Sequence, residues 1–114
     1  MLRDEASLLD IYRAGQKVLR YAEGLSRGDL EIEEIKLSAI LYQIEVVGEA
    51  TKRLSQNFRG NHPNIPWSRA TGMRDIIAHH YDRLDLDVVW NVIQYGIPEL
   101  IEMIEPLLPQ EPIA

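Results

Sequence analysis

The sequence predicts an all-α protein, an antiparallel bundle of four to five helices. Apolar residues recur at helical spacing in four segments, and no segment has a convincing strand pattern. The connections between these segments are short, which favours antiparallel neighbours. The chain has 114 residues, a length that fits one domain.

The first two helices are expected at residues 3–25 and 30–58, with the sequence SRGD between them. Asp29 is a suitable N-cap for the second helix because its side chain can accept from the first turn. Gly48 lies on or beside the apolar stripe of that helix. A glycine inside a helix costs about 1 kcal/mol relative to alanine, so we expect another backbone to approach closely there.

The loop RGNHPNIP separates the second helix from the third. Pro66 can open the third helix, since a proline in the first turn loses no needed N–H group. Asp85 is expected to cap a fourth helix, and Pro98 inside that helix should kink it or split it. Further prolines follow at 106, 109 and 112. We therefore expect one helical domain at residues 1–108 and a proline-rich tail at 109–114.

The composition limits the classes of function. Twelve basic and 18 acidic residues give a net charge of −6, which argues against a broad nucleic-acid-binding surface but leaves room for a small basic cleft. The chain has no cysteine, which excludes disulfides and thiolate metal sites and favours a cytoplasmic location. The first residues carry charges where a signal peptide needs an apolar stretch. No apolar run approaches the ~20 residues that cross a bilayer.

The third helix carries the segment GMRDIIAHHYDR, in which polar side chains crowd around apolar ones. At ~100° per residue, Arg74 and Tyr81 fall on nearly one line, and Asp75 stacks on His79. Arg74 and His79 differ by about 140° around the helix. Three arrangements stay open: the helix ends at the histidines, the arginine side chain wraps across, or a second chain contributes. Each of them predicts a cleft at an end or an interface.

These residue types suit metal-free cleavage of RNA. A histidine can take the proton of a 2′-hydroxyl near neutral pH, and an arginine can hold phosphate oxygens and stabilise charge that grows on them. Asp75 can fix the tautomer of His79. Tyr81 can donate to a phosphate or act as an acceptor hydroxyl.

The second helix can support this segment. Glu49 could pair with Arg74 and hold it in place, or it could form a solvated acidic ridge with Glu45. Four basic residues could supply a local positive rim for an RNA backbone. They are Lys52, Arg53, Arg59 and Arg69.

Structural roles are the alternative, and composition alone favours them. Arg74 could be a surface residue paired with Asp75 or Asp82, His79 could favour the dipole at a helix C-terminus, and Tyr81 could lie at the edge of the core. A metal site is less favoured, because adjacent histidines project apart on a helix and no Glu-x-x-His pair is present. Its ligands would be His62, His79 and His80.

The motif Arg-Asp-x-x-x-His-x-Tyr, present as RDIIAHHY, resembles the signature of the HEPN superfamily. More narrowly, it is similar to the HepT-type toxins that pair with a minimal nucleotidyltransferase antitoxin. Arg74, Asp75 and His79 match the HEPN motif, and Tyr81 matches the tyrosine that the HepT branch adds. The segments IEVVGEATKRLS, NIPWSRATGMRD, VVW and IPEL also look like this family. The resemblance spans roughly residues 37–108.

The resemblance implies a HEPN-like bundle that forms a two-fold homodimer, with the motif lining a cleft between the subunits. It implies a metal-independent endoribonuclease without a cofactor, with RNA as its substrate, acting as the toxin of a toxin–antitoxin pair. His79 would be the general acid/base, Arg74 the phosphate and transition-state ligand, and Asp75 the orienting residue. The antitoxin would silence the site by adding AMP to Tyr81, and it could form a higher complex with the dimer.

A second class of function stays open. A non-catalytic HEPN-like dimer could bind a nucleotide or a partner protein through the same cleft, and both classes need the same residues. His80 is not fixed by the motif and receives no catalytic role.

Overall fold

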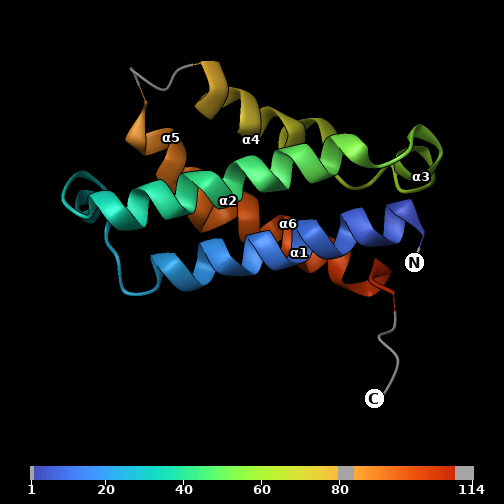
Figure 1. Ribbon diagram of the computed structural model, residues 1–114, viewed down its shortest axis with the longest axis horizontal. Helices are drawn as coiled ribbons and strands as arrows, with labels where there is room; N and C mark the ends of the chain where they lie inside the picture. Colours follow the sequence, from blue (N-terminus) through green and yellow to red (C-terminus); the bar gives the residue numbers. More distant parts are fainter. Residues whose placement is uncertain (1, 80–83, 110–114) are drawn as a thin grey trace.

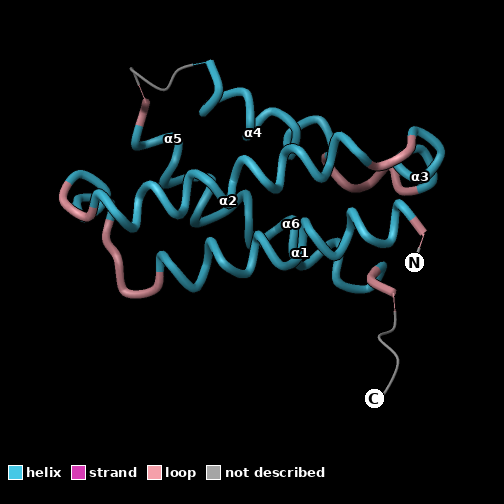
Figure 2. Tube along the Cα trace, viewed as in Figure 1, coloured by secondary structure: helices cyan, strands magenta, loops and turns pink. Residues whose placement is uncertain are grey.

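The computed structural model describes residues 2–79 and 84–109, without the side chains of residues 76–79. The regular secondary structure of these residues is helical throughout, which confirms the all-α prediction (Figure 2). No helix in the described part of the chain is both long enough and apolar enough to span a membrane.

Three long helices and one composite helical segment build the bundle (Figure 1). α1 (Arg3–Ala22) and α2 (Glu34–Arg53) lie antiparallel to each other, joined through the 3₁₀ turn η1 (Arg27–Glu31). α4 (Trp67–His79) packs on α2, and α6 (Ile97–Ile104) packs on α1. α2 therefore lies between α1 and α4 and forms the wall that supports the motif.

Shorter elements complete the chain. α3 (Gln56–Asn61) connects α2 to α4, and η4 (Glu105–Leu107) follows α6. α5 (Leu86–Asn91) continues through the π-helical turn η3 (Val92–Gly96) directly into α6. Pro98 lies in the first turn of α6, where its ring cannot accommodate the regular turn before it, so the helix widens there. The disturbance predicted at Pro98 takes this form, and the segment is not split.

The predicted N-cap role of Asp29 is wrong. Its carboxylate accepts a hydrogen bond from the backbone N–H of Ser26 at 2.8 Å, closing a capping box around η1. The start of α2 at Glu34 therefore comes later than predicted. α1 also ends before the predicted position, and Gly24 follows it with a φ of 79°, a value that favours glycine.

The predicted C-terminal end of the second helix is also wrong. Leu54 has an extended backbone, and the side chain of Ser55 accepts from the backbone N–H of Phe58 at 3.0 Å, so a serine N-cap starts α3. The predicted cap at Asp85 is confirmed: its carboxylate accepts from the backbone N–H groups of Asp87 and Val88 at 2.9 and 3.4 Å. The predicted tail at residues 109–114 lies outside the described residues from residue 110 onward.

The core lies where α1, α2, α4 and the α5–α6 segment meet. The predicted apolar stripes supply most of it, and their most deeply buried large side chains include Leu8, Ile11, Val18, Ile40, Ile44, Val47, Leu54, Val89, Ile93, Ile97 and Ile104. Burial of these side chains holds α2 in a fixed position, and α2 in turn positions the polar residues on its flank.

Candidate functional site

α4 meets α2 at Gly48. A Cβ atom at Gly48 would collide with the Cβ of Arg74 and would lie 3.3 Å from both the backbone N and the Cα of that residue. Backbone atoms cannot move aside as the end of a flexible side chain can. The glycine thus allows the two helix backbones to approach at the motif arginine, which confirms the close approach expected from the sequence.

Glu49 holds the side chain of Arg74. The Nε of Arg74 lies 2.6 Å from Oε1 of Glu49, and the two side chains are 29% and 47% exposed. The N–H of this buried Nε is not directed at a hydrogen-bond acceptor among the described residues, so the contact is an ion pair without an aligned hydrogen bond. The pairing that the sequence suggested is therefore present. A guanidinium has five N–H donors, so one carboxylate contact leaves donors for a phosphate.

Asp75 lies beside Lys52 on α2. Their Oδ1 and Nζ atoms are 3.8 Å apart and both side chains are about half exposed, so solvent screens the pair strongly. The described ion pair of Arg74 is with Glu49, and Asp75 lies against Lys52 instead. The other alternative partner, Asp82, lies outside the described residues. The predicted contact of Asp75 with His79 lies outside the described side chains and stays a prediction.

α4 continues to His79, so positions 74 and 79 belong to one helix. The backbone therefore separates the two positions by about 140° around the α4 axis, and Arg74 is turned toward α2. The predicted role of Tyr81 falls outside the described residues, and so does His80, which has no catalytic role in the prediction. What the described part places together is Gly48, Glu49 and Arg74, an arginine fixed at the contact between two helices.

Comparison with known proteins supports the resemblance to the HepT branch of the HEPN superfamily. A family model described as "Ribonuclease HepT-like" matches residues 11–107. This chain belongs to the HepT-like ribonuclease family.

Named relatives of this HepT-like chain come from archaea and bacteria. "Putative RNase MJ0125" of Methanocaldococcus jannaschii is 32% identical over 109 residues, covering 91% of this chain and 90% of the relative. "Putative RNase TTE0752" of Caldanaerobacter subterraneus is 31% identical over 94 residues, covering 82% and 84%. "Probable ribonuclease HepT" of Thermococcus cleftensis is 30% identical over 100 residues, covering 88% and 91%. No solved structure matches the chain.

The basic rim predicted for this HepT-like protein is not one continuous patch. Three of its four residues reach toward different helices, in the ion pairs Lys52–Asp75 at 3.8 Å, Arg53–Asp10 at 3.1 Å and Arg69–Glu99 at 3.9 Å. Arg59 on α3 differs, because its Nε is buried without a hydrogen-bond partner in the described part of the chain. The local positive charge near Arg74 is therefore modest.

No group of three or more metal-ligating side chains occurs in the described part of this HepT-like protein. His62, one of the three histidines considered as metal ligands, packs its ring on Phe58 with the ring centroids 4.7 Å apart. Its backbone carbonyl accepts from the indole N–H of Trp67 at 3.0 Å. These contacts give His62 a structural role at the C-terminal end of α3, against the first residue of α4.

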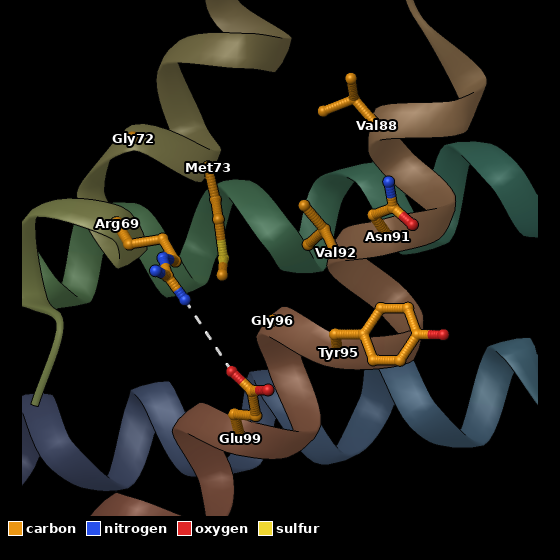
Figure 3. Close-up of a pocket in the computed structure, with 9 residues that line it drawn as sticks. All are labelled: Arg69, Gly72, Met73, Val88, Asn91, Val92, Tyr95, Gly96 and Glu99. Carbon is orange, nitrogen blue, oxygen red and sulfur yellow. Dashed lines mark ion pairs between the residues drawn. The ribbon is translucent and has the colours of Figure 1, made fainter.

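The structure also reveals a feature that the sequence did not predict. A groove of about 470 Å³ opens between α4 and the α5–η3 segment (Figure 3). Arg74 is turned instead toward Glu49 on α2. It is lined by Arg69, Gly72, Met73, Val88, Asn91, Val92, Tyr95, Gly96 and Glu99. The signal that could have indicated it is a pair of glycines, Gly72 and Gly96, inside helical segments. Motif reasoning passed over both of them.

Proposed function

We propose that this protein is a metal-independent endoribonuclease and the toxin of a HEPN/nucleotidyltransferase toxin–antitoxin pair. The observation that supports this most is the Glu49–Arg74 ion pair at the Gly48 contact, because it fixes the motif arginine before any substrate binds. Preorganised charge of this kind is what phosphoryl chemistry requires. The absence of cysteine suits a cytoplasmic protein.

In the proposed reaction, His79 takes the proton from a 2′-hydroxyl of RNA. The 2′-oxygen attacks the adjacent phosphorus, the bond from phosphorus to the 5′-oxygen breaks, and the leaving oxygen takes up a proton. The products are a 2′,3′-cyclic phosphate and a 5′-hydroxyl. Arg74 stabilises the charge on the phosphate oxygens, while Glu49 positions Arg74 and Asp75 orients His79.

We propose a two-fold homodimer that uses the outer face of α2. Ile35 and Tyr42 are 86% and 63% exposed, and Ala39 and Val46 lie on the same line of the helix. Ile35 and Tyr42 project into solvent, Val46 is partly buried against the core, and the stripe runs directly to Glu49 (residues 35, 39, 42, 46 and 49 fall within about 40° of one line). A second copy seated there would bring both Arg74–Glu49 pairs to the interface, which suits a site shared between subunits.

The dimer is testable by light scattering at micromolar concentration. The parent should scatter as twice 13.1 kDa, and Tyr42→Glu should shift it toward the monomer. A charge placed at the centre of an apolar interface is left without a partner, which opposes association. A parent that stays at 13.1 kDa across that range contradicts the proposed dimer.

Regulation of the site is proposed to act through Tyr81. Its phenol oxygen would attack the α-phosphate of ATP on the antitoxin, releasing pyrophosphate, with the phenolic proton passing to a base or to solvent. The added AMP would occupy Arg74 and exclude RNA. Co-expression with the nucleotidyltransferase should raise the mass by about 329 Da per AMP, a value set by nucleotide chemistry, and Tyr81→Phe should abolish the shift.

Cleavage of single-stranded RNA in excess EDTA tests the proposed activity. His79→Ala should lower the rate about 10²–10⁴-fold, as loss of a general acid/base does. His80→Ala is the matched control, because the neighbouring histidine has no assigned role. If His79→Ala cuts RNA as fast as the parent, a contaminating nuclease explains the activity.

A non-catalytic dimer that binds a nucleotide or a partner protein through the same cleft is the second candidate. The ion pairing of three rim residues favours it, since the acidic chain then offers little open positive charge to RNA. This candidate predicts binding of a nucleotide or a protein with no cleavage by the parent.

A further inference from the structure

We propose that the groove between α4 and the α5–η3 segment receives one base of the RNA strand. It would act as a base-recognition subsite next to the cleavage site. This inference rests on the proposed ribonuclease function, and it assigns the groove a ligand of definite chemistry: a flat apolar ring with a polar edge and an attached phosphate.

The floor of the groove suits the face of a base. The side chain of Met73 is buried, and Met73 and Val92 face each other across the groove with Val88 beside them (Figure 3). The volume of about 470 Å³ falls within the range of small-ligand pockets, about 300–1,000 Å³. Gly72 lines this space, and a Cβ atom there would meet nothing within 4 Å.

The rim of the groove suits the polar parts of a nucleotide. The amide of exposed Asn91 offers both a donor and an acceptor, which complement the edge of a base. Tyr95 is 64% exposed and its ring extends outward from η3, away from Met73 (Figure 3), where it offers a surface for stacking to a base outside the groove. Arg69 and Glu99 are 3.9 Å apart and both more than half exposed, so solvent screens this pair and Arg69 can turn to a phosphate at little cost. An apolar peptide would leave these polar groups unused.

The position of the groove connects it to the motif. Met73 immediately precedes Arg74 on α4, and Gly72 precedes Met73, so the groove and the arginine share one turn of helix. They face different sides of α4. Arg74 contacts Glu49 on α2, whereas the end of the Met73 side chain lies so close to Gly96 on η3 that a Cβ atom there would be 2.9 Å from its Cε. An RNA strand that crosses α4 at Arg74 can therefore place a neighbouring base in the groove.

Binding of a short single-stranded RNA with 2′-O-methyl groups tests the inference, because this RNA lacks the attacking hydroxyl and is not cleaved. Gly72→Leu fills the groove, and fluorescence anisotropy should show affinity weakened roughly 5- to 150-fold, the effect expected for loss of one stacked base. Gly60→Leu on α3 is the matched control. Position 60 also has nothing within 4 Å of its Cβ and lies outside the groove.

A set of RNAs, each lacking the base at one position, separates the groove from a general effect. In the parent, removal of the base at one position should weaken binding about as much as Gly72→Leu does with the intact RNA. In Gly72→Leu that position should have almost no effect, since two changes that remove one contact are not additive. Equal abasic effects in the two proteins, or unchanged affinity of Gly72→Leu, overturn the proposal.

Two further results distinguish the failure of the subsite from the failure of the ribonuclease. If the parent cleaves unmodified RNA and Gly72→Leu binds and cleaves equally well, only the subsite is wrong. If the parent neither binds nor cleaves RNA, the proposed ribonuclease fails and the subsite fails with it. If Gly72→Leu converts a dimer to a monomer, the groove belongs to an interface between copies and the subsite is also wrong.

Discussion

The two sides of α4 use glycine for opposite purposes. Toward α2, Gly48 removes a methyl group that would collide with the Cβ of Arg74 and crowd its backbone, and the helices close on each other. Toward α5 and η3, a Cβ atom at Gly72 would meet nothing within 4 Å, and the groove lies open there. A single helix of 13 residues thus has one closed side and one open side.

This difference separates two tasks that a nuclease must perform. The closed side fixes the charge of Arg74 through Glu49, and fixed charge is useful where the transition state is stabilised. The open side offers a groove with half-exposed or exposed polar residues at its rim, which suits the adaptable recognition of a strand. Variants on the closed side should therefore change mainly the rate of RNA cleavage, and variants that fill the open side should change mainly the affinity for RNA.

The largest effect is expected on the closed side, from Arg74→Ala. Loss of one preorganised donor to a developing oxyanion lowers the rate about 10²–10³-fold, so cleavage of RNA should fall by that amount. The half-exposed Glu49 that loses its partner can be hydrated, so thermal unfolding should move little. Arg20→Ala on α1 is the control for loss of one positive charge. Normal cleavage by Arg74→Ala would remove the arginine from the mechanism.

The second effect tests whether the closed side is closed by backbone contact. Gly48→Ala should destabilise the fold by roughly 1–3 kcal/mol, the usual cost of overpacking, because the new methyl group meets backbone atoms of Arg74 at 3.3 Å. Urea unfolding followed by circular dichroism measures it. An unchanged midpoint would mean that α2 and α4 can separate without cost, and the contrast between the two sides would then disappear.

The third effect concerns Glu49, which positions Arg74. Glu49→Gln keeps the size of the side chain and removes its charge, and cleavage should slow about tenfold, a loss of about 1.4 kcal/mol in transition-state stabilisation. Both partners are partly exposed, so the free energy of unfolding should change by less than about 1 kcal/mol. The matched control is Glu45→Gln, one turn earlier on α2. Equal activity of the two variants would favour the acidic-ridge interpretation.

Much of the closed side could be predicted from the sequence, and the open side could not. Gly48 predicted the close approach of α4 because glycine is costly inside a helix. The cap at Asp85 and the disturbance at Pro98 could be predicted because each depends only on neighbouring residues in the chain. Glu49 remained one of two alternatives, since its partner comes from another helix. The ends of α2 were missed because the apolar spacing continues past both, while Ser26 with Asp29, and Ser55, form local caps. The groove depends on how α4 lies against η3, which only tertiary packing determines.

The smallest effect is expected on the open side, where a glycine-to-alanine change should raise the free energy of unfolding rather than lower it as at Gly48. Gly72 lies inside α4, Gly24 is the only described residue with a positive φ, and a methyl group at position 72 meets nothing within 4 Å. Gly72→Ala should therefore stabilise the fold by about 0.5–1 kcal/mol, because alanine loses less backbone entropy on folding than glycine does. Urea unfolding of this variant and of Gly48→Ala, run side by side, measures the predicted gain and the predicted loss in stability. Gly60→Ala on the short helix α3 is the control, because that position is also open. Destabilisation by Gly72→Ala would show that something fills the groove in solution, and the two sides of α4 would then be closed alike.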